Sequence, residues 1–285
     1  MNHLHTRSVV GSDGTMQAGH GSHPVVRVKS QGPFKHELDE LATEIPVALE
    51  YNGIAHATLL LTPCDLHDFA YGFSYTEGVI RRASDIYGID IIEQENGYVI
   101  QAEIASACLH QLKRRRRHMA GRTGCGLCGL ESLDDVQRPL SALTKRPAFL
   151  RPQAIATALH QLRQQQALHQ VTGATHAAAW ANLDGTILYV REDVGRHNAL
   201  DKLIGHLLRA SIKPEHGFAV ISSRASFEMV QKAASAGISA LIAVSAPTSY
   251  AANLANSLNV FLAGFGRDHG FTVYAHPEFL SEDVQ

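Results

Sequence analysis

Residues 218–263 read FAVISSRASFEMVQKAASAGISALIAVSAPTSYAANLANSLNVFLA, and this stretch decides the fold of the second half of the chain. Short apolar runs alternate in it with stretches of helical spacing, and Gly237 ends the first helical stretch. Strands that alternate with helices predict a largely parallel sheet with helices on both faces. The predicted elements are strand 218–221, helix 227–236, strand 241–245, helix 251–258, strand 260–263 and a further strand 272–275.

The residues that follow these predicted strands form a candidate ligand-binding edge. In parallel sheets, ligands bind beyond the carboxyl ends of the strands. Here those ends carry hydroxyl groups, glycine and arginine, which suits an anionic ligand held by N–H groups at helix N-termini. Caps and turns have the same composition, so both interpretations stay open for each loop. The candidate residues are Ser222, Ser223, Arg224, Thr248 and Ser249, with a third loop at residues 264–267.

The densest polar cluster of the chain is Arg191 to Asn198, between a predicted strand and an amphipathic helix. An acid, an arginine, a histidine and an amide at one strand end suit hydrogen bonding to a base or ribose. The alternative is a helix N-cap with solvated neighbours. The helix that follows has an apolar stripe that includes Leu200 and Leu203, so we expect Lys202 and His206 on its other face to lie outside the core.

The first half of the chain has a different pattern. Two hairpins are predicted around Asn52-Gly53 and Asn96-Gly97, because this dipeptide supplies the positive φ angles of a tight turn. Helices are predicted after Pro63 and at residues 106–119. Residues 1–24 are rich in Gly, Ser and His without apolar periodicity, which predicts an unstructured leader.

A glycine-rich segment after the second of these helices contains Cys125 and Cys128. A Cys-x-x-Cys pair can be half a zinc site, a dithiol redox couple or a nucleophile with a neighbour. A closed zinc site needs four ligands, whereas the other two cysteines, Cys64 and Cys108, stand alone, and this disfavours structural zinc. The nearby residues Arg114 to Arg117 and Arg122 would lower the pKa of the thiol below its usual ~8.5, unless the arginine run is only a solvated helix end.

Composition excludes several classes of function. The formal net charge of −2 argues against a general nucleic-acid binder. Apolar runs stay far below the ~18 residues of a membrane span, so we expect no membrane insertion. Four cysteines in 285 residues do not make a disulfide framework, and the first residues lack the apolar core of a secretory signal. A cytoplasmic location is therefore expected.

Five motifs occur in this order: GRTGCGLCG (121–129), THAAAW (175–180), REDVGRHNALDK (191–202), SSRASFEMVQKAASAG (222–237) and AVSAPTS (243–249). With them the chain resembles the formate dehydrogenase accessory sulfurtransferase family over residues 40–276. The resemblance implies that a cysteine desulfurase supplies sulfur as a persulfide, carried on Cys125 with Cys128 assisting. It also implies delivery of that sulfur to the molybdenum or tungsten bis(pyranopterin guanine dinucleotide) cofactor, before the cofactor enters formate dehydrogenase. A homodimer is expected on the same ground.

The resemblance also assigns a cofactor-binding stretch to this chain. Its residues are Phe265, Gly266, Arg267, Asp268, His269 and Gly270. We expect the strand-end pocket to bind GDP as a fragment of the cofactor, with Asp193 accepting from the guanine or ribose edge. The second half should be similar to cytidine deaminases in fold. The deaminase zinc signature, His-x-Glu followed by Pro-Cys-x-x-Cys, is absent, because Ala177 and Ala178 follow His176.

The fold prediction is therefore an α/β protein with two domains. The smaller N-terminal α+β domain covers residues 25–130, a linker follows at 131–150, and a deaminase-like α/β/α domain with a mostly parallel or mixed sheet covers 151–285. Three functions are open: a sulfurtransferase, a chaperone that binds the cofactor or the apo-dehydrogenase without covalent chemistry, and a zinc-dependent nucleotide enzyme. No metal ligands are assigned.

Overall fold

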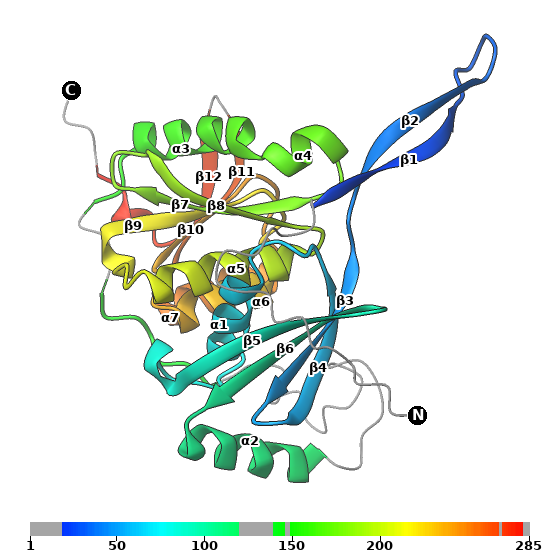
Figure 1. Ribbon diagram of the computed structural model, residues 1–285. Helices are drawn as coiled ribbons and strands as arrows, with labels where there is room; N and C mark the ends of the chain where they lie inside the picture. Colours follow the sequence, from blue (N-terminus) through cyan, green and yellow to red (C-terminus); the bar gives the residue numbers. More distant parts are fainter. Residues whose placement is uncertain (1–18, 120–138, 146–148, 268–269, 282–285) are drawn as a thin grey trace, which may run out of the picture.

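A computed structural model describes residues 19–119, 139–145, 149–267 and 270–281. Its elements stack in layers (Figure 1): helices α3 and α4, a six-stranded sheet, helices α5 to α7, helix α1, a four-stranded sheet and helix α2. The predicted α/β class is confirmed. Among the described residues, no helix is long and apolar enough to cross a membrane.

The six-stranded sheet belongs to the second half of the chain and has the order β12-β11-β10-β9-β7-β8. Neighbours β9, β10 and β11 are parallel, while β7 and β12 run antiparallel to the strands beside them. The sheet is therefore mixed, as one of the two predicted alternatives had it. Its strands are β7 (His176–Asn182), β8 (Ile187–Asp193), β9 (Gly217–Ile221), β10 (Ala240–Ala243), β11 (Phe261–Arg267) and β12 (Gly270–Ala275).

Helices cover both faces of this sheet (Figure 1). On one face lies α3 (Pro152–Gln165), with the short α4 (Ala167–Thr172) after it. On the other face lie α5 (Arg196–Arg209), α6 (Phe227–Ser235) and α7 (Ser249–Leu258). Two separate apolar clusters result, because alternate side chains of each buried strand point to opposite faces.

The four-stranded sheet of the first half has the order β4-β3-β6-β5. Its strands are β3 (Ile45–Tyr51), β4 (Ile54–Leu61), β5 (Ile86–Gln94) and β6 (Gly97–Ile104), and the short helix η1 (Ala83–Asp85) precedes β5. Both predicted hairpins are present. The second turn lies one residue earlier than predicted, because Gly97 opens β6, where a Cβ would lie only 2.0 Å from the Pro46 carbonyl oxygen.

Helices α1 (Leu66–Thr76) and α2 (Ser106–Met119) pack against this sheet and bury a third apolar cluster. Phe69 and Phe73 of α1 belong to that cluster, as do Cys108 and Leu112 of α2. Sequence spacing predicted both helices correctly. Helix α1 also faces the second half of the chain, which sequence spacing did not predict.

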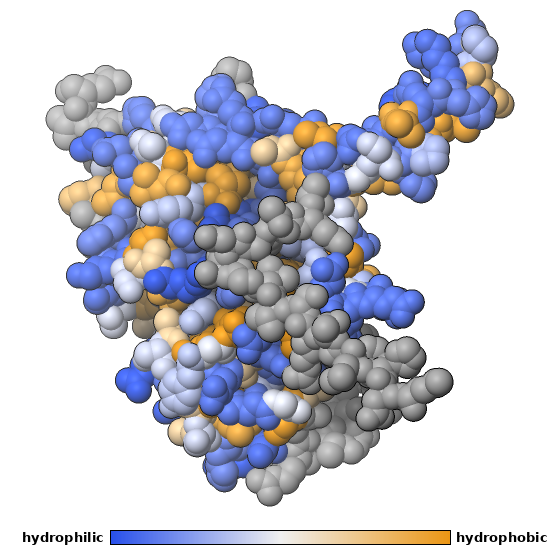
Figure 2. Space-filling view, viewed as in Figure 1, coloured by the Kyte–Doolittle hydropathy of each residue, from blue (hydrophilic) through white to orange (hydrophobic). Residues whose placement is uncertain are grey.

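A two-stranded arm, β1 (His20–Arg27) paired with β2 (Lys35–Ala42), extends from the body (Figure 1). The prediction of an unstructured leader up to residue 24 is therefore wrong for residues 20–24, which belong to β1. Arg27 pairs across the arm with Glu37 and Asp39, so charged pairs stabilise strands that lack apolar alternation. Apolar side chains remain exposed here (Figure 2), among them Leu38 at 70% exposure.

The two halves dock through a close crossing of α1 and α5. Gly72 and Gly205 lie at the crossing, where a Cβ on Gly72 would be 1.7 Å from the Asp201 carbonyl oxygen and one on Gly205 equally close to that of Asp68. Backbones can approach this closely only when neither residue carries a side chain. The crossing buries the face of α5 that was expected to lie outside the core.

Buried ion pairs accompany this crossing. Lys202 is fully buried, and its Nζ lies 2.6 Å from Asp193 Oδ2. Lys232 of α6 contacts Asp201 at 2.9 Å and also Glu77 of the first half. Burial alone would lower the pKa of Lys232, but the carboxylates of Asp201 and Glu77 outweigh it and raise that pKa. The expectation that Lys202 lies outside the core is thus wrong, because α1 covers that face.

Part of the predicted linker, residues 139–145, runs along the second half without regular structure. The Leu143 N–H donates to the Leu258 carbonyl oxygen at 2.9 Å, and Lys145 pairs with Glu215 at 3.0 Å. These contacts attach the described part of the linker to the C-terminal layers.

Candidate functional site

The predicted thiol segment with Cys125 and Cys128 lies outside the described residues. The other two cysteines are described, and both have a pKa raised by burial. Cys108 is 5% exposed and Cys64 is partly buried. A raised pKa leaves little thiolate at neutral pH, so neither is a good nucleophile. This directs attention to the cysteines of the thiol segment.

The predicted strand-end loops lie along one edge of the six-stranded sheet. Strands β8, β9 and β10 end there, helices α5, α6 and α7 begin there, and β7 runs in the opposite direction and starts there at His176. Adjacent strands lie about 4.8 Å apart, so the edge from β8 to β11 spans about 19 Å. The predicted residues therefore line one edge without meeting at one point.

Several predicted hydroxyl groups bind the protein backbone. Ser222 Oγ accepts from the Ala177 N–H at 2.9 Å, and Ser223 Oγ donates to the Arg224 carbonyl oxygen at 3.0 Å. Thr248 Oγ1 caps α7 by accepting from the Ala251 N–H at 3.2 Å. Capping and turn formation thus explain these three side chains. Of the predicted residues in these two loops, Arg224, Thr248 and Ser249 are exposed, and among these three the hydroxyl of Thr248 serves as the cap of α7.

Asp193 occupies a different environment from the one predicted. It is fully buried, and its two oxygens accept from the backbone N–H groups of Thr62 and Gly195 and from Asn198 Nδ2. Lys202 supplies the fourth contact. The carboxylate has no acceptor position left for a ligand, so the hypothesis that Asp193 reads a guanine edge is wrong for this structure.

A polar cluster at the start of α5 and α6 is the strongest candidate at this edge. Arg196 Nε and Ser226 Oγ are buried without a hydrogen-bond partner among the described residues. Buried polar atoms normally have a partner, so such groups point to a missing ligand or solvent. His197 Nε2 lies 2.8 Å from Glu228 Oε2, which connects the two helix N-termini.

Burial and the neighbouring Arg196 lower the pKa of His176. Burial also lowers the pKa of His197, where Arg196 adds to the effect and Glu228 opposes it. Both imidazoles are therefore neutral near neutral pH and can donate or accept hydrogen bonds. The sequence does contain a signal for Arg196 and His197, since both lie in the polar cluster REDVGRHN. Within that cluster, however, the residue predicted to contact the ligand is Asp193.

The predicted cofactor-binding stretch lies at the other end of the edge. Phe265 has a φ of 53° and is 47% exposed, and β11 is irregular between Gly264 and Arg267. Such a φ is strained for an aromatic residue, and strain of this kind is found at ligand sites. Gly266 is buried, Arg267 and Gly270 are exposed, and Asp268 and His269 lie outside the described residues.

Sequence comparison identifies the family. The profile of the FdhD/NarQ family matches residues 42–281. The chain belongs to this family. The resemblance inferred from the five motifs is thereby confirmed, and the match covers both halves of the structure but begins where the arm ends.

Relatives match most of the chain. A protein of Bordetella petrii named sulfur carrier protein FdhD is 56% identical over 247 residues, which is 86% of this chain and 87% of the relative. One of the same name from Cupriavidus necator is 53% identical over 254 residues, 89% of this chain and 88% of the relative.

A solved structure shares the fold. It is that of a Desulfotalea psychrophila protein described as a formate dehydrogenase accessory protein, with a TM-score of 0.71 and 22% identity. The match covers 93% of this chain and 100% of that one. The arrangement of sheets and helices is therefore that of a known fold.

Proposed function

We propose that this protein is a sulfur carrier that serves the molybdenum cofactor of formate dehydrogenase. The observation that carries the proposal is the name of its relatives, sulfur carrier protein FdhD, at 50–56% identity over most of the chain. The pair Cys125 and Cys128 supplies the chemistry, since the pKa values of Cys64 and Cys108 are raised by burial. A reactive thiol needs thiolate character.

The proposed loading step is a sulfur transfer without net oxidation. The Cys125 thiolate attacks the outer sulfur of a persulfide on a cysteine desulfurase, a sulfur–sulfur bond forms on Cys125, and the desulfurase thiolate leaves. For delivery, Cys128 attacks Cys125 to form a disulfide and releases hydrogen sulfide, whose sulfur replaces an oxygen ligand of molybdenum that leaves as water. A dithiol reductant then restores both thiols.

The strand-end edge is the proposed binding place for the cofactor, which is the substrate here. Arg196 offers a buried Nε without a partner in the described structure, and the N-termini of α5 and α6 favour an anion. Exposed Arg224 and Arg267 extend the positive charge along the edge. A bis(dinucleotide) is long enough to use a 19 Å edge, of about four strand spacings, whereas GDP would occupy part of it.

Base selection falls to a residue other than Asp193 in this proposal. Glu228 is half-buried at the start of α6 and has one ion-pair contact in the described structure, to His197. Its carboxylate can accept from the guanine N1 and exocyclic amine, while an adenine would leave it unpaired. Phe265 presents an exposed ring on which a base can stack.

Intact mass after incubation with a cysteine desulfurase and cysteine tests the sulfur chemistry. One persulfide adds ~32 Da, and we expect this gain in the native chain and in Cys64→Ser but not in Cys125→Ser. The Cys64→Ser variant is the matched control because that thiol is partly buried. A gain of the same size in Cys125→Ser and its loss in Cys128→Ser would move the persulfide to Cys128. No gain in any chain would favour the chaperone hypothesis.

Calorimetry with GDP and ADP tests the pocket separately. We expect Arg196→Gln to weaken GDP binding by about tenfold or more, as for loss of a charge-assisted hydrogen bond. Glu228→Gln should instead reduce the preference for GDP over ADP. Unchanged GDP affinity in Arg196→Gln would refute the placement of the phosphates, and equal binding of GDP and ADP by the native chain would refute base selection.

A further inference from the structure

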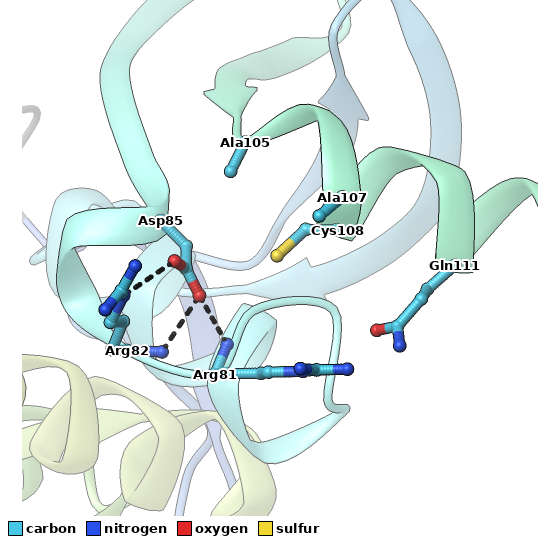
Figure 3. Close-up of a pocket in the computed structure, with 7 residues that line it drawn as sticks. All are labelled: Arg81, Arg82, Asp85, Ala105, Ala107, Cys108 and Gln111. Atoms are coloured by element: carbon cyan, nitrogen blue, oxygen red, sulfur yellow. Dashed lines mark hydrogen bonds and ion pairs between the residues drawn. The ribbon is translucent and has the colours of Figure 1, made fainter.

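A groove that the proposed chemistry does not use lies beside η1 and α2. It consists of two adjoining pockets of about 360 Å³ and 310 Å³, both lined by Arg81 and Gln111. The first pocket lies within the N-terminal half, at Cys108 (Figure 3). The second reaches Leu140 of the linker and Ser235 of α6. We call the two together the η1–α2 groove.

Two arginines line this groove: Arg82 pairs with Asp85 at 3.0 Å, whereas the positive charge of Arg81 stays available. Arg81 is exposed, and its guanidinium extends along the groove toward Gln111 (Figure 3). No ion pair to it occurs in the part of the chain that the structure describes. The N-terminus of α2 also opens here at Ala105 and Ala107, and a helix N-terminus carries partial positive charge.

The carboxylate in the lining, that of Asp85, is already satisfied. Its oxygens accept from the N–H groups of Arg81 at 2.9 Å and Arg82 at 3.2 Å and from Arg82 Nε at 3.0 Å. Burial opposes its ionisation, but these donors outweigh burial and lower the pKa of Asp85. Asp85 is therefore ionised, and its charge is compensated by Arg82, which leaves Arg81 as the unpaired charge in the lining of the groove.

The same face of α2 leads toward the thiol segment. Gln111 follows Cys108 by three residues and Arg114 follows Gln111 by three, so each side chain neighbours the next along the helix. Arg114 is exposed and so extends the positive wall beyond Gln111. From Gln111 to the end of the helix at Met119 is about 12 Å at 1.5 Å per residue, and Cys125 follows six residues later.

We propose that the η1–α2 groove is the docking site for an acidic segment of a partner protein, which it holds within reach of the thiol segment. The positive groups at Arg81, at the N-terminus of α2 and at Arg114 match a row of carboxylates, whereas one phosphate would meet only part of them. Apolar lining from Ile80 and Leu140 can accept apolar side chains between those carboxylates. The role of this docking site beside the thiol segment rests on the proposed sulfur-carrier function.

Fluorescence anisotropy of the full chain tests the groove. The probe is a fluorescein-labelled peptide of alternating glutamate and leucine, compared with the same peptide carrying glutamine for glutamate. We expect binding of the acidic peptide, weakened by added salt, and at least about tenfold weaker binding in Arg81→Glu/Arg114→Glu. Gln111→Arg, which adds a positive charge to the same wall, should tighten binding.

The matched control is Lys29→Glu/Lys35→Glu, which makes the same charge change on the distant, exposed arm (Figure 1). It should alter binding by less than about twofold. Equal loss in both double variants, or equal binding of the glutamine peptide, would overturn the proposal. Displacement by inorganic phosphate at matched ionic strength would show a small-anion site and overturn it too. All chains carry Cys125→Ser and Cys128→Ser, so failure of the sulfur chemistry cannot cause failure here.

Discussion

Replacing Asp193 by Asn separates a structural role for this carboxylate from a role in reading guanine. The change keeps the size of the side chain but removes the charge that lies 2.6 Å from the buried Lys202 Nζ. It also turns one acceptor oxygen into a donor that faces the N–H of Thr62 or of Gly195. Loss of one partner of a buried ion pair costs about 3–5 kcal/mol.

The lower end of that range applies to this site. Lys202 Nζ keeps two other acceptors, the carbonyl oxygens of Thr62 at 2.9 Å and Glu192 at 3.2 Å. We therefore expect a loss of about 3 kcal/mol in the free energy of unfolding, which lowers Tm by roughly 6–12 °C. Differential scanning calorimetry measures Tm, and titration with GDP and ADP at a temperature where the variant is folded measures selectivity.

The expected pattern is a lower Tm with an unchanged preference for GDP over ADP. The control is Asp90→Asn, at an exposed position on β5, which should change stability by less than about 0.5 kcal/mol. An Asp193→Asn variant with native Tm that no longer prefers GDP would refute the structural role. The carboxylate would then have to become accessible when ligand binds.

Two further predictions concern stability. Gly205→Ala should lower Tm by the equivalent of about 2–3 kcal/mol, because its Cβ would lie 1.7 Å from the Asp68 carbonyl oxygen, although alanine usually stabilises a helix. The control is Gly88→Ala, where a Cβ meets open space, and it should have little effect on Tm. A Gly205→Ala variant with a raised Tm would disprove the close crossing. The lowered pKa values of His176 and His197 mean that only the unfolded chain takes up their protons as pH falls through about 6.5. Tm should therefore fall between about pH 7 and pH 5, less steeply in His197→Gln, and an equal slope in that variant would contradict the assignment.

Local patterns were enough to predict the elements of the two sheets, and their failures have a common cause. Asn52-Gly53 formed the predicted turn, with φ angles of 48° and 75°. Lys202 could not be placed from the stripe on its own helix, since a second helix from 130 residues earlier covers the polar face. Helical periodicity shows which residues share a face of one helix, but not what packs against that face. Whether a charge is buried depends on a distant partner in the fold, which for Lys202 is Asp193.

The same limit applies to the candidate site. Hydroxyl groups at strand ends suggested ligand contacts, but Ser222 and Thr248 bind backbone groups of their own edge. Sequence composition cannot distinguish a cap from a contact because both need the same atoms at the same place. Arg196 became the stronger candidate only when the structure showed a buried donor without a partner in the described region. Whether a buried polar atom has a hydrogen-bond partner depends on how the chain packs, so it cannot be predicted from the sequence.

The docking of the halves restricts how a thiol and a cofactor can meet. The α1–α5 crossing buries Lys202 and Lys232 with their partner carboxylates, and opening it would expose those pairs and separate surfaces that fit only because Gly72 and Gly205 lack side chains. Swinging one half away from the other is therefore an unfavourable way to bring the two sites together. Cys125 follows the end of α2 by six residues, which span at most about 20 Å. In the proposed function, the thiol would therefore reach the cofactor either within one chain, across that span, or at the strand-end edge of a second copy. The distance from α2 to the proposed cofactor site decides between these two routes.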